Sequence, residues 1–260
     1  MRKQRRKGRK KGKPRGRAVV TGGTGTAARV VELLGGVWSW ASLRDLVPEG
    51  VNPTKGVQRV RGEAKDRVLT VEELGRLGRA LGDEPAGSAL RIVALTGLRR
   101  EEAESLKWSE IDFAASYLRL AETKTGRSVR PIGAPALDLL RGLPRIEDCP
   151  WVFPNRDCTG PADLKERMAE IFARAGLPGR DEKSQALRRT LGSIAADEGY
   201  GDAAIKELLG HARRGVTEQY YVRRSDPVIV AMANRVAARV DAAMKGNAGA
   251  DTQLAASVPN

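Results

Sequence analysis

Apolar residues recur at helical spacing over most of the chain from about residue 69 onward. Thr70 and Glu73 have the three-residue spacing of a capping box, and Leu74 and Leu77 mark one apolar face behind them. The same periodicity predicts further helices at about 88–95, 100–107, 161–175, 184–198, 202–209 and 226–244. This part of the chain is therefore expected to be mostly α-helical.

Two short segments between these helices alternate apolar and polar residues in the manner of β-strands. They are Tyr117–Ala121 and Ser128–Ile132, and Gly126 lies between them at a position that suits a turn. The two segments predict a hairpin, and residues 151–154 favour one more short strand. The expected fold class is α+β, mostly α-helical, with a small β-hairpin or sheet.

The N-terminal part of the chain has a different pattern. Residues 26–41 are predicted to form one helix, in which Trp38 and Trp40 are expected to be core anchors. Prolines and many charges then indicate a linker. The predicted organisation is a basic, disordered tail at 1–25, a helix and linker at 26–68, a main domain at 69–245 and a disordered tail at 246–260.

The net charge of +14 is concentrated at one end of the chain. Residues 1–17 hold eleven of the 46 Lys and Arg residues and no acid, so the remainder has 35 basic against 32 acidic residues. A tail of this kind holds polyanions, most simply nucleic acid, although a solubilising extension has the same composition. Contacts to phosphates carry no sequence information, so the tail cannot select a DNA site.

Composition and short motifs exclude several classes of protein. Hydrophobic residues at 41% and charged residues at 30% are ordinary for a globular protein, and no apolar run is long enough to span a membrane. Cys149 and Cys158 cannot build a disulfide framework, and the basic start lacks the apolar run of a secretory signal. These features predict a cytoplasmic protein. Hydrolase and P-loop motifs are absent.

A glycine motif near the N-terminus indicates a different function. Gly23-x-Gly25-x-x-Ala28 follows an apolar run and precedes a helix, as at the start of a dinucleotide-binding domain. A second strand ending in an acidic residue should follow, but the sequence continues with Gly35-Gly-Val-Trp and a charged linker. An NAD(P)-dependent oxidoreductase therefore remains only the weakest alternative, and a flexible loop before a helix explains the same residues.

Four short motifs and one tyrosine occur in a fixed order along the main domain. They are Thr96-Gly-Leu-Arg99, Thr123-Lys124-Thr125, Gln185-Ala-Leu-Arg188 and Leu208-Leu-Gly-His211, with Tyr220 nine residues after His211. This arrangement resembles the tyrosine recombinase, or phage-type integrase, family. The family pattern has Arg in T-G-x-R, a hairpin Lys, H-x-L-R, L-L-G-H and a Tyr nine residues later. The resemblance covers about residues 26–244 and is clearest over 69–224.

The resemblance implies site-specific DNA cleavage and rejoining through a 3′-phosphotyrosyl intermediate. Arg99 and Arg188 match the two family arginines, which suit the non-bridging oxygens of a phosphodiester. Lys124 then is the general acid for the 5′-oxygen, although a lysine in a turn is also ordinary. His211, the only histidine, hydrogen-bonds the phosphate, and Tyr220 is the nucleophile. The mechanism requires no metal and no cofactor.

The sequence departs from the family pattern in two places. Gln185 stands where the family usually has His, and an amide can hydrogen-bond a phosphate but cannot exchange a proton. Residues 26–68 resemble only the end of the helical core-binding domain that normally precedes the catalytic domain. The expected protein is a recombinase of double-stranded DNA that self-associates on it as a dimer or tetramer. The alternative is a catalytically impaired remnant that only binds DNA.

Overall fold

The computed structural model describes residues 23–58, 66–121, 123, 126–177, 183–210 and 227–247. Contacts between residues divide the chain into two compact units, 1–64 and 65–260. The first unit contains one described helix, and the second contains the described strands and the other described helices.

The helix of the first unit is α1 (Thr24–Ser42), which begins after Gly23 as its N-cap. Its apolar side chains are exposed at Val30, Leu33, Leu34, Val37 and Trp40. The prediction that Trp40 anchors a core is wrong for this unit, because the residue is 52% exposed and its ring lies 4.4 Å below the Arg44 guanidinium. Within residues 23–58, which the structure describes, one helix and the loop after it offer no second layer that covers this face.

The glycine motif lies at the start of α1, and the apolar run before Gly23 lies outside the described residues. No strand occurs among the described residues 23–58, and α1 continues without interruption through Gly35 and Gly36. A dinucleotide-binding domain needs a parallel sheet at this point. The oxidoreductase alternative therefore has no support in the part of this unit that the structure describes.

The second unit is built mainly from short helices. In chain order its elements are α2 (Val71–Ala80), α3 (Pro85–Thr96), α4 (Arg100–Glu104), the 3-10 turn η1 (Trp108–Glu110), β1 (Ile111–Asp112), β2 (Tyr117–Leu120), β3 (Ser128–Pro131), α5 (Ala134–Gly142), α6 (Lys165–Arg174), α7 (Lys183–Asp197), α8 (Asp202–Leu208) and α9 (Pro227–Met244). The predicted capping box is present, since the Thr70 side chain accepts from the Glu73 N–H and the Glu73 carboxylate accepts from the Thr70 N–H.

Several short elements differ from the expectation. Helix α4 ends at Glu104 and not near Lys107, and η1, β1 and α5 were not predicted. Residues 151–154 form isolated bridges, Lys107 with Trp151 and Pro154 with Pro161, and not a strand. The turn η1 and the strand β1 have only three and two residues, which are too few to show a period in the sequence.

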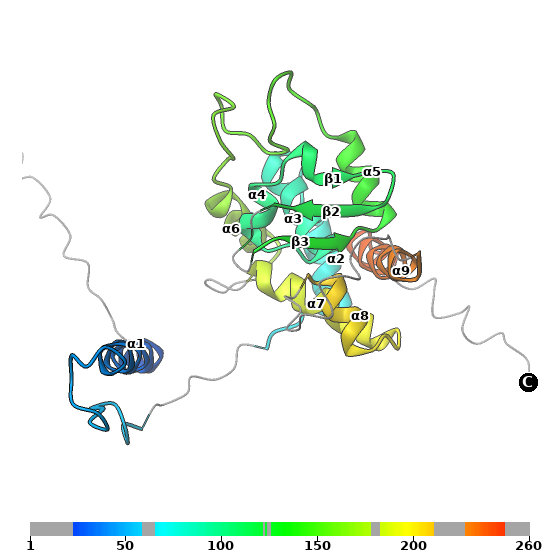
Figure 1. The fold of residues 1–260 in the computed structure, drawn as a ribbon. Helices are drawn as coiled ribbons and strands as arrows, with labels where there is room; N and C mark the ends of the chain where they lie inside the picture. The colour runs from blue at the N-terminus through cyan, green and yellow to red at the C-terminus, as the bar shows by residue number, and fades with distance from the viewer. Residues whose placement is uncertain are drawn as a thin grey trace, which may run out of the picture. The chain divides into compact units, whose positions relative to one another are not determined.

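The three strands form an antiparallel sheet in the order β1-β2-β3 (Figure 1). Tyr117 pairs with Pro131 and Leu120 with Ser128, which confirms the predicted hairpin between β2 and β3. Thr123 and Gly126 exchange backbone hydrogen bonds of 3.1 and 3.0 Å at the base of the turn. Gly126 has φ of +94°, a left-handed conformation that suits glycine. Residues 124 and 125, between Thr123 and Gly126, lie outside the described part of the chain.

Helix α9 packs on the same chain against α2, α3, α5 and α7. Its buried face consists of Met232, Ala233, Val236, Ala237, Val240, Ala243 and Met244. The Asn234 side chain accepts the N–H of Ala134 at 2.7 Å, which ties α9 to the start of α5. A Cβ on Gly78 of α2 would lie 1.9 Å from the Met244 carbonyl oxygen, so the two backbones touch. Helix α9, which follows the last motif in the sequence, therefore completes the hydrophobic core of this unit.

Candidate active site

The T-G-x-R segment makes a sharp turn between α3 and α4. Gly97 ends α3 in a left-handed conformation, with φ of +65°, and its N–H bonds the Val93 carbonyl. A Cβ at this position would lie 2.8 Å from a methyl carbon of Leu209 and 3.0 Å from one of Leu191. Both the conformation and the space therefore require glycine. The turn places Arg99 at the N-cap of α4.

Glu102, in the first turn of α4, collects hydrogen bonds from two arginines. The Arg99 backbone N–H donates to Oε2 at 2.8 Å, and Arg99 Nη1 donates to Oε1 at 2.7 Å. Arg130 of β3 donates Nη1 to Oε2 and Nη2 to Oε1, both at 2.9 Å. These four bonds use the approximately four acceptor positions of one carboxylate. Glu102 therefore fixes the relative positions of the T-G-x-R turn and the hairpin.

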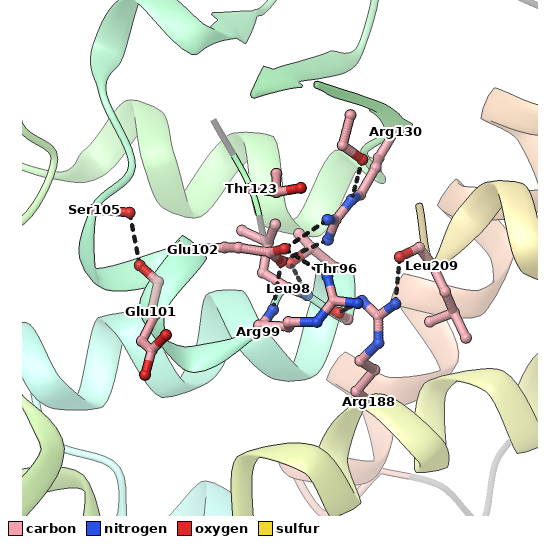
Figure 2. Close-up of polar contacts among 12 residues, drawn as sticks. Thr96, Leu98, Arg99, Glu101, Glu102, Ser105, Thr123, Arg130, Arg188 and Leu209 are labelled. Carbon is pink, nitrogen blue, oxygen red and sulfur yellow. Dashed lines mark hydrogen bonds and ion pairs between the residues drawn. The ribbon is translucent and has the colours of Figure 1, made fainter. Parts of the chain in front are cut away.

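Arg188 reaches the same place from α7. It is 8% exposed, its Nη1 donates to the Gly97 carbonyl, and its Nη2 donates to the Leu209 carbonyl at 2.6 Å. Figure 2 shows the side chains of Arg99, Arg130 and Arg188 pointing toward one another from three different elements. Arg188 thus joins the end of α3 to the end of α8, where the L-L-G-H motif begins.

The charges of the cluster do not cancel. Three guanidinium groups face one carboxylate, which leaves two positive charges. Burial by itself would raise the pKa of Glu102, but the hydrogen bonds and charge of Arg130, followed by bonds from Arg99, lower it to about 2. Burial lowers the pKa of Arg188 to about 10, helped by the repulsion of Arg130 and Arg99. Arg188 remains charged at neutral pH, so the site attracts an anion.

The lowered pKa of Glu102 predicts a pH-dependent stability. The ionised carboxylate is favoured in the folded state, so its contribution is complete above the unfolded pKa near 4.5 and is lost as the pH falls toward about 2. We expect Glu102→Gln to unfold at lower urea concentration than the wild type at pH 7, with a deficit on the order of 3 kcal/mol. This deficit shrinks as the pH falls from about 5 to about 3. Urea titrations of both proteins at several pH values measure it.

The matched control is Glu101→Gln, at the neighbouring position of the same helix. The Glu101 side chain is 84% exposed and pairs only with Arg100 among its described ion pairs. Its substitution is expected to leave stability unchanged at every pH. A deficit of Glu102→Gln that stays constant between pH 7 and pH 3 would contradict the role assigned to the carboxylate.

The structure brings together two of the six predicted site residues. Arg99 and Arg188 meet beside Glu102, as described above. Gln185 lies one turn before Arg188 on α7 and is exposed. Lys124, His211 and Tyr220 lie outside the described residues, so their places in the site stay predictions. The flanking Thr123 lies in the turn between β2 and β3, and Gly210 follows Leu209, whose carbonyl accepts from Arg188.

Arg130 is the residue that sequence analysis missed. It is 0% exposed and forms a two-pronged ion pair with Glu102, while its Nε donates to the Ser128 hydroxyl at 2.9 Å. The alternating pattern placed it in a strand, but a charged residue at such a position is normally expected to face solvent. The only available signal was its position in the strand that leaves the predicted hairpin.

The described residues contain no group of three or more His, Cys, Asp or Glu side chains that could hold a metal ion. Among the same residues, no helix is both long and apolar enough to cross a membrane. Among the described residues, the arginine cluster around Glu102 is therefore the candidate active site.

Comparison with known protein families identifies the fold around this cluster. The phage integrase family matches residues 67–226, which include the T-G-x-R turn, the hairpin, and helices α7 and α8. The chain belongs to the phage integrase family. The resemblance inferred from the four motifs is thereby confirmed, and so is the α+β, mostly helical catalytic domain with a small sheet.

Curated members of the integrase family are between a quarter and a third identical to this chain over the residues that match. Prophage integrase IntF of Escherichia coli is 29% identical over 153 residues, which are 56% of this chain and 32% of that protein. Tyrosine recombinase XerA of Pyrococcus furiosus is 27% identical over 162 residues, which are 58% of this chain and 56% of that protein. The chain thus matches from a third to little more than half of these relatives' lengths.

Solved structures of integrases and recombinases have the same fold. The integrase from mycobacterium phage Brujita superposes with a TM-score of 0.54 at 18% identity, over 85% of this chain and 74% of the phage protein. The XerH site-specific recombinase, bound to its palindromic difH substrate in a post-cleavage complex, superposes with a TM-score of 0.58 at 16% identity. That match covers 90% of this chain and 67% of XerH.

Proposed function

We propose that this chain cleaves and rejoins double-stranded DNA at specific sites through a covalent bond to Tyr220. The observation that carries the proposal is the meeting of Arg99 and Arg188, 89 positions apart in the sequence, in a cluster with two uncompensated positive charges. Family membership supports the same reaction, because relatives are named tyrosine recombinases and integrases. Residues 67–226, the part that matches the family, contain the proposed nucleophile.

The role of each residue follows from the phosphate oxygens on which negative charge develops in the transition state. The Tyr220 phenol gives up its proton to water as its oxygen attacks a DNA phosphorus, a new P–O bond forms, and the bond from phosphorus to the 5′-oxygen breaks. Arg99 and Arg188 bind the non-bridging oxygens, which gain negative charge in the transition state. Lys124 gives a proton to the departing 5′-oxygen, while Gln185 and His211 hydrogen-bond the phosphate. Attack of a 5′-hydroxyl on the phosphotyrosine reverses every step and rejoins a strand. The cleavage and rejoining steps, as written, use no metal ion and no redox cofactor.

The proposed partners are double-stranded DNA and further copies of the same chain. A λ integrase dimer bound to a COC′ core site has this fold, with a TM-score of 0.55. Strand exchange between two DNA sites needs more than one active site, which supports assembly as a dimer or tetramer on DNA. A protein that acts on bacterial or phage DNA works in the cytoplasm, where we place this chain.

Covalent capture tests the proposal. The protein is incubated with nicked duplexes that tile the DNA flanking its own gene on both sides, so that the short fragment released by cleavage diffuses away. A recombinase leaves a protein–DNA adduct that survives denaturing electrophoresis. A remnant that only binds DNA shifts the same duplexes in a native gel and forms no adduct under any condition.

The N-terminal tail is expected to strengthen DNA binding without selecting the site. Deletion of residues 1–17 removes eleven basic residues. Each phosphate contact contributes about −0.9 to the slope of log affinity against log salt, so deletion flattens this slope by several units. Affinity measurements between about 50 and 200 mM salt give the slope. Deletion of residues 246–260, which contain no Lys or Arg, is the control of similar length. An unchanged slope after the first deletion would refute a DNA-binding role for the tail.

A further inference from the structure

Arg130 connects three parts of the site although its own side chain is closed off from solvent. The residue lies on β3, its guanidinium forks onto Glu102 of α4, and its Nε donates to Ser128. A Cβ on Gly210, directly after the C-cap of α8, would lie 2.0 Å from Arg130 Nε and 2.6 Å from its Cδ. The Arg130 side chain therefore packs directly on the Gly210 backbone, and the left-handed Gly210, with φ of +61°, makes room for it.

We infer that Arg130 is a positioning residue for strand cleavage, which holds Glu102 so that the Arg99 guanidinium faces the DNA phosphate. The inference rests on the proposed function of the site. Arg130 is 0% exposed, so it acts through its neighbours and does not touch DNA. The family pattern of an Arg, a hairpin Lys, a second Arg, a His and a Tyr does not include it.

The hydrogen-bond geometry gives the physical reason. Glu102 receives two bonds from Arg130 and two from Arg99, one of which comes from the Arg99 backbone. The fork of Arg130 fixes the plane of the carboxylate, because a planar guanidinium and a planar carboxylate pair in one orientation. The Arg99 side chain, 30% exposed, is then held by a single Nη1 bond. Without Arg130, the carboxylate is free to rotate onto Arg99 and to draw its guanidinium away from the phosphate.

Charge acts in the same direction. Three arginines and one glutamate leave two positive charges, and loss of Arg130 leaves one. In a site where Arg188 and Glu102 are nearly buried, the loss of a nearby positive charge reduces the attraction for the negative charge of the transition state. Arg130→Met removes both the fork and the charge, whereas Arg130→Lys keeps the charge and loses the fork.

The test is a double-mutant cycle on the rate of covalent attachment. Single-turnover rates on the nicked duplex that captures the wild type are measured for Arg130→Met, Arg99→Lys and the double variant, at saturating protein. We expect Arg130→Met to slow attachment about 10- to 100-fold in the wild-type background and by a factor at least about 5-fold smaller beside Arg99→Lys, where only the lost positive charge still slows the reaction. Equal losses in the two backgrounds would overturn the inference, because a residue that merely supports the fold acts independently of Arg99.

Two further variants separate positioning from folding. Ile132→Ala changes another fully buried residue, two positions after Arg130, that belongs to the hydrophobic core. It is expected to lower the melting temperature while attachment per folded protein stays within about 2-fold. Arg130→Lys tests the inference if Arg130→Met fails to fold, with an expected 3- to 30-fold loss of attachment rate per folded protein. If Arg130→Lys forms adduct at the wild-type rate, the inference about Arg130 is overturned and the proposed function stands. If the wild-type chain itself forms no adduct, the proposed function is overturned.

Discussion

Replacement of Tyr220 by phenylalanine is expected to abolish covalent attachment to DNA while leaving non-covalent affinity within about 2-fold. The phenol oxygen is the proposed nucleophile, and without it no P–O bond to the protein can form. A single missing oxygen removes little of the binding, most of which comes from phosphate contacts elsewhere. Denaturing gels give the adduct, and native gels with the same nicked duplex give the affinity.

Tyr221→Phe is the matched control, since the same oxygen is lost from the adjacent residue. Tyr221 lies ten residues after His211, and the family spacing of nine selects Tyr220. We expect Tyr221→Phe to form adduct at a rate within about 3-fold of the wild type. Adduct that persists in Tyr220→Phe and disappears in Tyr221→Phe would assign the nucleophile to the other tyrosine.

The parts of the site that sequence could predict are those in which local chemistry and spacing agree. Gly97 is required by a left-handed conformation and by the approach of Leu209, and such a requirement leaves a visible glycine before Arg99. Gly126 marks the hairpin turn for the same reason. The long amphipathic helices α7 and α9 were also predictable, because several turns repeat the same apolar face.

The parts that sequence could not predict depend on contacts between distant segments. Arg130 and Glu102 are 28 positions apart, and nothing local distinguishes a buried arginine that forks onto a carboxylate from one that faces solvent. The same limit applies to Trp40, which is 52% exposed although the Arg44 guanidinium lies over its ring. Helix α5 was missed because its nine residues contain two prolines or glycines and only two and a half turns.

We expect Arg188→Lys to slow covalent attachment by about 10²–10³-fold, the usual cost of losing one preorganised donor at a developing oxyanion. The guanidinium spans two carbonyl oxygens, those of Gly97 and Leu209, and one lysine ammonium cannot keep both and still present a planar fork to a phosphate. Single-turnover kinetics at saturating protein separate this loss from weaker DNA binding.

Arg189→Lys, at the next position of α7, makes the same chemical change outside the cluster. One residue along a helix turns a side chain by about 100°, and Arg189 has no described hydrogen bond to Glu102, Gly97 or Leu209. Its rate is expected to stay within about 3-fold of the wild type. If Arg188→Lys folds and attaches DNA at the Arg189→Lys rate, the two carbonyl bonds serve only to join α3 to α8. The phosphate would then have to be held by Arg99 and by residues of the segment 211–226.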